Sequence, residues 1–152
     1  DDQLTSINQR LHEPIPRIEL GIALRGFVSA GIDISDGLLG DLRHILKASD
    51  VSAEIWLDLL PVSCILQEQQ NHIRRQCAAA GGDDYELCFT APQCHRSRIQ
   101  EISHDLDIPL TRIGQLVNNK RIAPNMTLLD QDGKALDTEL TNSLLQSFDH
   151  FK

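Results

Sequence analysis

The sequence predicts an α/β protein in which packed helices cover a mixed β-sheet, folded as a single domain over residues 1–152. Its 152 residues, 41% hydrophobic and 24% charged, are enough for one compact core. Segments with helical and with strand periodicity alternate along the first two thirds of the chain. Short strand-like segments separated by turn residues follow them, which adds strands to the sheet.

Helices are predicted where apolar residues recur every three or four positions. The strongest case is 36–48, in which Leu38 and Leu42 begin a stripe that faces the core. Ser35 is placed as the N-cap of this helix, and Asp36 falls in its first turn. The other predicted helices cover 1–12, 17–26, 64–79 and 93–106.

Strands are predicted where short apolar segments lie between turn residues. The clearest is 85–90, where Tyr85, Leu87 and Phe89 alternate with Glu86, Cys88 and Thr90. The other predicted strands cover 27–34, 51–57, 110–117 and 126–130. A hairpin turn at Asp132-Gly133 leads from the last of these into a further short strand, 134–136, so we expect a meander of short strands over 110–136. A polar segment then closes the chain.

The formal net charge is -8, from 14 Lys+Arg and 22 Asp+Glu, which argues against nucleic acid or an anionic membrane surface as a partner. No apolar run approaches the roughly 20 residues of a membrane span. The four cysteines contain no C-x-x-C pair, so a zinc site of the usual spacing is not expected. Reduced thiols are typical of the cytoplasm, where we expect this protein to be located.

The stretch "GIDISDGLLGDL" places two acids where a buried strand gives way to a helix. Asp33 ends the strand and Asp36 follows three residues later. Two carboxylates at one corner repel each other unless a cation lies between them, and hard oxygen ligands favour Mg²⁺ or Ca²⁺. A helix N-terminus beside them also attracts phosphate. The helix dipole alone can account for Asp36, but it does not account for Asp33.

A second stretch, "AAAGGDDYELCF", places acids at the entry to another buried strand. Gly81 and Gly82 allow close backbone approach, and Asp83 and Asp84 follow them. A helix C-cap followed by a polar loop is the structural alternative. That alternative accounts for the glycines better than for two adjacent acids.

Together, "IDISDGLLGDL", "GGDDYELCF" and "RIGQ" resemble the C-terminal half of the thiamine-monophosphate kinases. This family belongs to the superfamily of aminoimidazole ribonucleotide synthetase and selenophosphate synthetase. "PRIELGIALRGFVSAGIDISDGL", "WLDLLPV" and the terminal "FDHF" extend the resemblance over nearly the whole chain. It implies the fold of that superfamily's C-terminal domain, and the ATP- and Mg²⁺-dependent phosphorylation of thiamine monophosphate to thiamine diphosphate.

The resemblance also implies roles for individual residues. Asp33 and Asp36 match the family's magnesium-binding aspartates, and Ser35 matches its ATP-contacting serine. Asp84 matches the substrate-contacting acid of the G-G-E-D-Y-E-L motif, and Phe148 matches an aromatic position that lies against the thiamine. No catalytic residue is expected, because the acceptor phosphate, with a second pKa near ~6, is largely ionised at neutral pH.

Two features separate this chain from the whole family pattern. Asp83 stands where the family has Glu, and its shorter side chain leaves the role of that position open. The family's N-terminal domain, which supplies further magnesium ligands and forms a homodimer, is expected outside this chain. No Walker-type G-x-x-x-x-G-K-[ST] segment replaces it. The isolated chain is therefore expected to be inactive.

Three alternatives stay open. The chain can belong to a relative that uses ATP on another small acceptor, for which residues 84 and 148 would decide. "DISDGLL" is similar to the D-x-D-G-T-L loop of aspartyl-phosphate phosphatases, but its spacing is D-x-x-D and the Thr is absent. A third alternative is a non-catalytic module that binds the ligands without turning them over.

Overall fold

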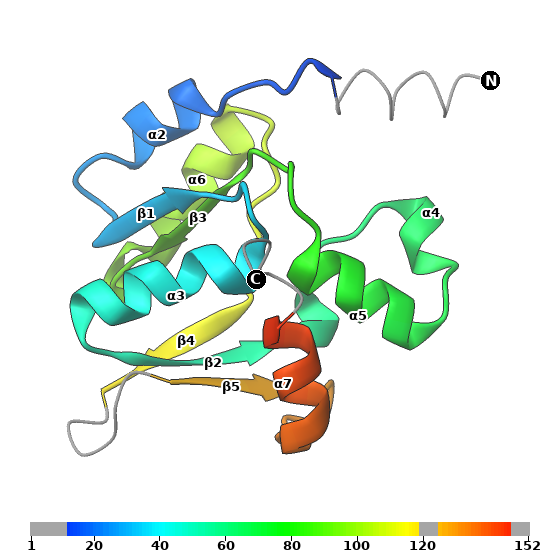
Figure 1. Ribbon diagram of the computed structural model, residues 1–152. Coiled ribbons are helices and arrows are strands. Elements are labelled where there is room, and N and C mark those ends of the chain that lie inside the picture. The colour runs from blue at the N-terminus through cyan, green and yellow to red at the C-terminus, as the bar shows by residue number, and fades with distance from the viewer. Residues whose placement is uncertain (1–11, 119–124, 147–152) are drawn as a thin grey trace.

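The computed structural model describes residues 12–118 and 125–146 of the chain (Figure 1). The helices are α2 (Ile18–Leu24), α3 (Leu38–Ser49), α4 (Cys64–Gln67), α5 (Asn71–Ala80), α6 (Arg96–Asp105) and α7 (Thr138–Gln146), with short 3₁₀ turns η1 (Leu57–Leu59) and η2 (Gln93–His95). The strands are β1 (Ala30–Asp33), β2 (Ser52–Trp56), β3 (Leu87–Thr90), β4 (Gly114–Val117) and β5 (Met126–Leu129). The helix predicted over 1–12 lies almost wholly outside the described residues.

The strands form two sheets, which confirms the α/β class with a mixed sheet. β1 pairs with β3 in antiparallel register, with Asp33 opposite Leu87. β2 lies at the centre of the second sheet, antiparallel to β4 and parallel to β5. The predicted meander is wrong for β4 and β5, which do not pair with each other. Its hairpin at Asp132-Gly133 is confirmed by the antiparallel bridge between Leu129 and Ala135. Ala53 and Ile55, both buried, make β2 a central strand that accepts a neighbour on each edge.

Helix α3 lies between the two sheets and carries the main core (Figure 1). Its apolar stripe, predicted from Leu38 and Leu42, is buried as expected. The cluster around it includes Ile55 and Leu128 of the three-stranded sheet and Cys88 of the two-stranded sheet. Burying one such leucine stabilises the fold by about 1.5–3 kcal/mol, so α3 is held firmly against both sheets.

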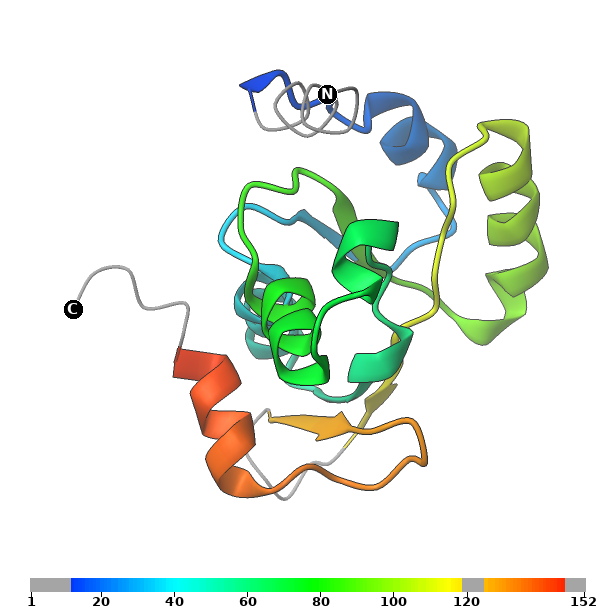
Figure 2. The same cartoon turned by 90° about the vertical axis from the view of Figure 1, so that its right-hand side faces the viewer.

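A second cluster covers the other face of the β1–β3 sheet. It is centred on Leu20 and Leu24 of α2 and Ile102 of α6. Figures 1 and 2 both show α2 and α6 side by side beyond this sheet. Strand β3 therefore alternates between two cores: Cys88 contacts the α3 cluster, whereas Leu87 and Phe89 pack against the α2–α6 cluster.

Two further expectations are corrected. The helix predicted over 64–79 is two helices, α4 and α5, because residues 67–72 include no apolar side chain that could face the core. The closing polar segment, for which no helix was predicted, contains α7. The carboxylate of Asp137 accepts a hydrogen bond from the Leu140 N–H at 2.7 Å, which caps this helix, and Leu144 is buried.

None of the helices in the described part of the chain is long and apolar enough to cross a membrane.

Candidate functional site

The first acidic stretch forms the loop between β1 and α3. Gly37 is the N-cap of α3, with φ 109° and ψ 148°, a conformation that is essentially restricted to glycine. The helix therefore begins at Leu38 and cannot extend back through Gly37. The expectation that Ser35 caps the helix, with Asp36 in its first turn, is wrong. Both residues lie in the loop that precedes it.

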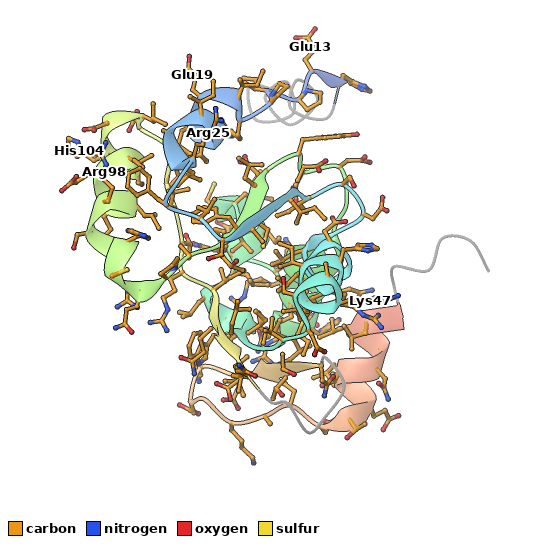
Figure 3. The ribbon with its side chains drawn as sticks, turned by 90° about the vertical axis from the view of Figure 1, so that its left-hand side faces the viewer. Glu13, Glu19, Arg25, Lys47, Arg98 and His104 are labelled. Atoms are coloured by element: carbon orange, nitrogen blue, oxygen red, sulfur yellow. The ribbon has the colours of Figure 1, made fainter. Side chains whose placement is uncertain are left out.

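Two acids lie where β1 passes into this loop: Asp33 ends the strand and Asp36 lies in the loop. Asp33 and Asp36 are exposed and Ser35 is half-buried. Within residues 12–118 and 125–146, neither Asp33 nor Asp36 forms an ion pair. Lys47, labelled in Figure 3, belongs to the last turn of α3, at the opposite end of the helix from this loop. This corner thus presents two acidic side chains that no cation within the described residues pairs with.

The second acidic stretch, residues 82–86, is joined to the first through the backbone. The Asp83 N–H donates to the Ser35 carbonyl at 2.8 Å. The Tyr85 N–H donates to the Ile34 carbonyl at 2.8 Å, and the Ile34 N–H donates to the Glu86 carbonyl at 2.8 Å. Three backbone hydrogen bonds therefore bring the two predicted motifs, about fifty residues apart in the sequence, into one structural unit.

The backbone of this second loop is strained. Asp83 and Tyr85 have φ of 63° and 51°, in the left-handed region that residues other than glycine rarely occupy. Tyr85 consequently precedes β3, which begins at Leu87, two residues later than the strand predicted over 85–90. Such strain persists only where surrounding contacts impose it, and here the bonds to Ile34 and Ser35 do so.

Asp84 is exposed and lines a cavity of about 210 Å³. The other lining residues are Glu13, Pro14, Ile15, Arg17 and Glu86. The Arg17 guanidinium donates to both carboxylate oxygens of Glu86, at 2.8 and 2.7 Å. The hydrogen bond with Glu86 is the main cause that raises the pKa of Arg17, so the guanidinium stays charged. This bidentate contact holds the segment before α2 beside Asp84.

A larger cavity, about 510 Å³, lies elsewhere, where η1, α5 and the turn at 130–132 meet. None of Asp33, Ser35, Asp36 or Asp84 lines it. Two of the charged groups that line it pair with each other: the Arg75 guanidinium donates to both oxygens of Asp58, at 3.1 and 2.6 Å. We therefore place the candidate site at the joined acidic loops and not at this larger cavity.

Sequence reasoning missed Asp41, the one buried charged residue in the part of the chain that the structure describes. Its Oδ2 accepts hydrogen bonds from the backbone N–H groups of Ser35 (3.0 Å) and Asp36 (3.2 Å). The spacing could have revealed it, because Asp41 follows Leu38 by three and precedes Ile45 by four, on the apolar stripe. An acid on a core-facing stripe requires hydrogen-bond donors.

The structure does not test the predicted contact of Phe148 with the substrate or the predicted binding of Mg²⁺. Phe148 lies outside the described residues. Among those residues, no group of three or more His, Cys, Asp or Glu side chains is placed to hold a metal ion. Two acids alone do not form a metal cage, but Mg²⁺ is commonly bound by one or two carboxylates together with substrate phosphates.

The fold agrees with the comparison to known proteins. Residues 9–126 match the model of the AIR synthase related protein, C-terminal domain, so the chain belongs to this family. Among individual proteins, it is 40% identical over 147 residues to the thiamine-monophosphate kinase of Haemophilus influenzae. That match covers 96% of this chain and 43% of the relative.

Solved structures give the same result. The chain resembles the crystal structure of thiamine-monophosphate kinase from Stenotrophomonas maltophilia K279a with a TM-score of 0.73 and 42% identity, over 86% of this chain and 40% of that one. It resembles the structure of AaThiL complexed with AMPPCP and TMP with a TM-score of 0.64 and 29% identity, over 88% and 39%. The chain thus spans less than half the length of the relatives it matches.

Proposed function

We propose that this chain carries part of the site of an enzyme that phosphorylates thiamine monophosphate to thiamine diphosphate with ATP and Mg²⁺. The observation that carries the proposal is the backbone junction of the two acidic loops, in which Asp83 bonds to Ser35 and Tyr85 to Ile34. The relatives' names support the reaction. The complex of AaThiL with AMPPCP, an ATP analogue, and TMP supports the pair of substrates.

Asp33 and Asp36 are proposed to hold Mg²⁺. The fit rests on the chemistry of the donors: both are exposed carboxylates with no ion pair within the described residues, and hard oxygen ligands suit Mg²⁺. When bound, the metal would supply positive charge that offsets the negative charge of the phosphates. An acidic protein of net charge -8 needs this charge to bring two phosphate-bearing substrates together.

The remaining assignments divide the site between its two loops. Ser35, half-buried in the first loop, is proposed to contact ATP. Asp84, at the cavity of about 210 Å³, is proposed to contact thiamine monophosphate together with Phe148. The cavity carries the carboxylates of Glu13, Asp84 and Glu86 against one guanidinium, so it favours a cationic group such as the thiazolium ring of thiamine.

The reaction that this arrangement supports is a direct transfer. A phosphate oxygen of thiamine monophosphate attacks the γ-phosphorus of ATP; a new P–O bond forms as the bond to the β-phosphate oxygen breaks, and ADP leaves. The attacking oxygen is already ionised at neutral pH, so no general base is assigned. The contribution of the protein is to position both phosphates and to keep the acidic loops in place.

The proposed site is incomplete within these 152 residues. We propose that an N-terminal domain supplies the other magnesium ligands, that the complete protein is a homodimer and that it acts in the cytoplasm. The partial span of the match to the relatives, 43% of the Haemophilus influenzae protein, supports a contribution from outside this chain.

Turnover tests this proposal directly. We expect no conversion of thiamine monophosphate when the 152-residue chain is given ATP and Mg²⁺ alone. Fusing the chain to the part of the Haemophilus influenzae kinase that it does not match should produce thiamine diphosphate and ADP in equal amounts. A fusion that folds, binds both substrates and yet releases only inorganic phosphate would contradict the proposed acceptor.

A further inference from the structure

Asp41 is a buried acid whose hydrogen bonds leave its own helix. It lies on the first turn of α3 and is 5% exposed, between leucines that face the core. Burying a carboxylate costs free energy unless donors compensate it. Within residues 12–118 and 125–146, Asp41 forms no salt bridge; the donors on its Oδ2 are two backbone N–H groups.

These contacts differ from helix capping. A capping side chain precedes the helix and accepts from N–H groups of the first turn. Asp41 does the reverse: it sits inside the helix and accepts from Ser35 and Asp36, six and five residues upstream. Because α3 is fixed between the two sheets, the carboxylate is a rigid anchor for the loop that precedes the helix.

The loop needs such an anchor because of what it carries. Asp33 and Asp36 bring like charges to the same loop, and their repulsion favours conformations that separate them. Gly37 adds backbone freedom at the next position, since it has no side chain to restrict φ. The Asp41 carboxylate accepts hydrogen bonds from the N–H groups of Ser35 and Asp36. These bonds oppose both the charge repulsion and the backbone freedom at Gly37.

We infer that Asp41 is a positioning residue for magnesium and nucleotide binding, acting through the backbone of Ser35 and Asp36 without touching either ligand. The inference rests on the proposed function for the identity of the ligands. The anchoring of the loop by Asp41 is a property of the ligand-free protein and does not depend on the proposed function. The two parts can therefore be tested separately.

The test compares Asp41→Ala with Asp41→Asn. Alanine removes both hydrogen bonds, whereas the Asn Oδ1 can occupy the place of Oδ2 and keep them. Asp50→Asn is the control. It removes one negative charge at the C-cap of α3, the end of the helix that lies away from the loop. Hydrogen exchange of the Ser35 and Asp36 amides measures the anchoring, and Mg²⁺ titration followed by amide NMR shifts measures the consequence for binding.

For Asp41→Ala we expect exchange at Ser35 and Asp36 to accelerate about tenfold or more while the amides of Ile45 and Leu46 stay protected. The Mg²⁺ affinity should fall about 10–100-fold, the usual effect of losing a group that orients a metal ligand. Asp41→Asn should stay within about threefold of wild type in both measurements, and Asp50→Asn should change neither.

Unchanged exchange at Ser35 and Asp36 in Asp41→Ala would overturn the anchoring. Faster exchange with unchanged Mg²⁺ affinity would reduce Asp41 to a structural residue and overturn the inference. An Asn variant as impaired as the Ala variant would also overturn it, because the acceptor geometry would not be the cause. Wild-type protein that binds no Mg²⁺ would contradict the proposed function instead, and the exchange measurement would still decide whether Asp41 fixes the loop.

Discussion

A methyl group added to Gly82 would lie 2.8 Å from the carbonyl oxygen of Ser35. Carbon and oxygen atoms do not approach this closely, so the two backbones can be this near only because residue 82 has no side chain. The contact lies beside the hydrogen bond from the Asp83 N–H to the same carbonyl. Gly82 is therefore needed for the junction of the two acidic loops.

Substituting Gly82 tests this junction. Gly82→Ala must push the 82–86 loop away from Ser35, and we expect binding of Mg-AMPPCP to weaken about tenfold or more because the site is misplaced. Isothermal titration calorimetry measures it. Gly21→Ala is the control: its new methyl group would meet only a Leu87 side-chain carbon at 3.9 Å, and alanine favours the helix. Equal affinities for Gly82→Ala and wild type would show that the junction tolerates displacement.

The Arg17–Glu86 pair allows the substrate side of the site to be tested apart from the nucleotide side. Arg17→Ala removes the bidentate contact that holds the segment before α2 beside Asp84. Because the side chains are 25% and 33% exposed, we expect a loss of only about 1 kcal/mol of stability. Binding of thiamine monophosphate should weaken, whereas binding of Mg-AMPPCP should not. If the affinities for both ligands fell by the same factor, the site would not be divided into a substrate side and a nucleotide side.

The Arg75–Asp58 pair predicts a pH dependence of stability. The hydrogen bond from Arg75 is the main cause that lowers the pKa of Asp58 below its ordinary value of 3.8. As the pH falls, the Asp58 carboxylate is therefore protonated in the unfolded chain before it is protonated in the folded protein. The contribution of the pair is complete above about pH 4 and is lost as the pH falls through the lowered folded-state value.

We expect Arg75→Ala to cost about 2 kcal/mol of unfolding free energy at pH 7, since it breaks two hydrogen bonds to a largely buried carboxylate. That difference from wild type should shrink in urea titrations below pH 4. Arg98→Ala, which breaks an exposed pair with Glu101 and a cation–π contact with Phe27, is the control and should cost no more than about 1 kcal/mol, independent of pH below 7; Arg98 is labelled in Figure 3. A cost at Arg75 that is independent of pH would contradict the role given to Asp58.

The four cysteines should react in two classes. Cys64, Cys77 and Cys94 are exposed, whereas Cys88 is buried in β3. Burial, assisted by the nearby Asp41 carboxylate, raises the pKa of Cys88 to about 11. At pH 8 a thiol reagent should label three cysteines of the native protein quickly and Cys88 only after unfolding. Mass spectrometry after tryptic digestion identifies the labelled residues, and rapid native labelling of Cys88 would contradict the packing of β3.

Much of the fold could be predicted from local pattern. The stripe begun by Leu38 and Leu42 identified α3, and the alternation around Leu87 and Phe89 identified β3. Helix starts were harder, because Gly37 stops α3 through its own φ and ψ, which a capping pattern at Ser35 does not reveal. Strand order was missed, since only tertiary packing decides that β4 and β5 lie on opposite sides of β2.

The candidate site, like the fold, was only partly predictable from the sequence. Asp33, Asp36 and Asp84 could be selected from acids placed at strand boundaries and from the family resemblance. The junction through Ser35 and Gly82 could not, because backbone contacts across fifty residues leave no periodic signal. Asp41 left a signal in its spacing, but only the structure identifies the amides that it binds.

The proposed Mg²⁺ site at Asp33 and Asp36 can be tested by titrating the ¹⁵N-labelled chain with AMPPCP, with and without Mg²⁺, in wild type and in an Asp33→Asn/Asp36→Asn variant. We predict Mg²⁺-dependent amide shifts at residues 33–37 and 82–85 in the wild type, and their loss in the variant, with Asp50→Asn behaving as wild type. Shifts that survive in the variant, or that fall at Arg74 and Arg75 around the larger cavity, would rule out a Mg²⁺ site at Asp33 and Asp36.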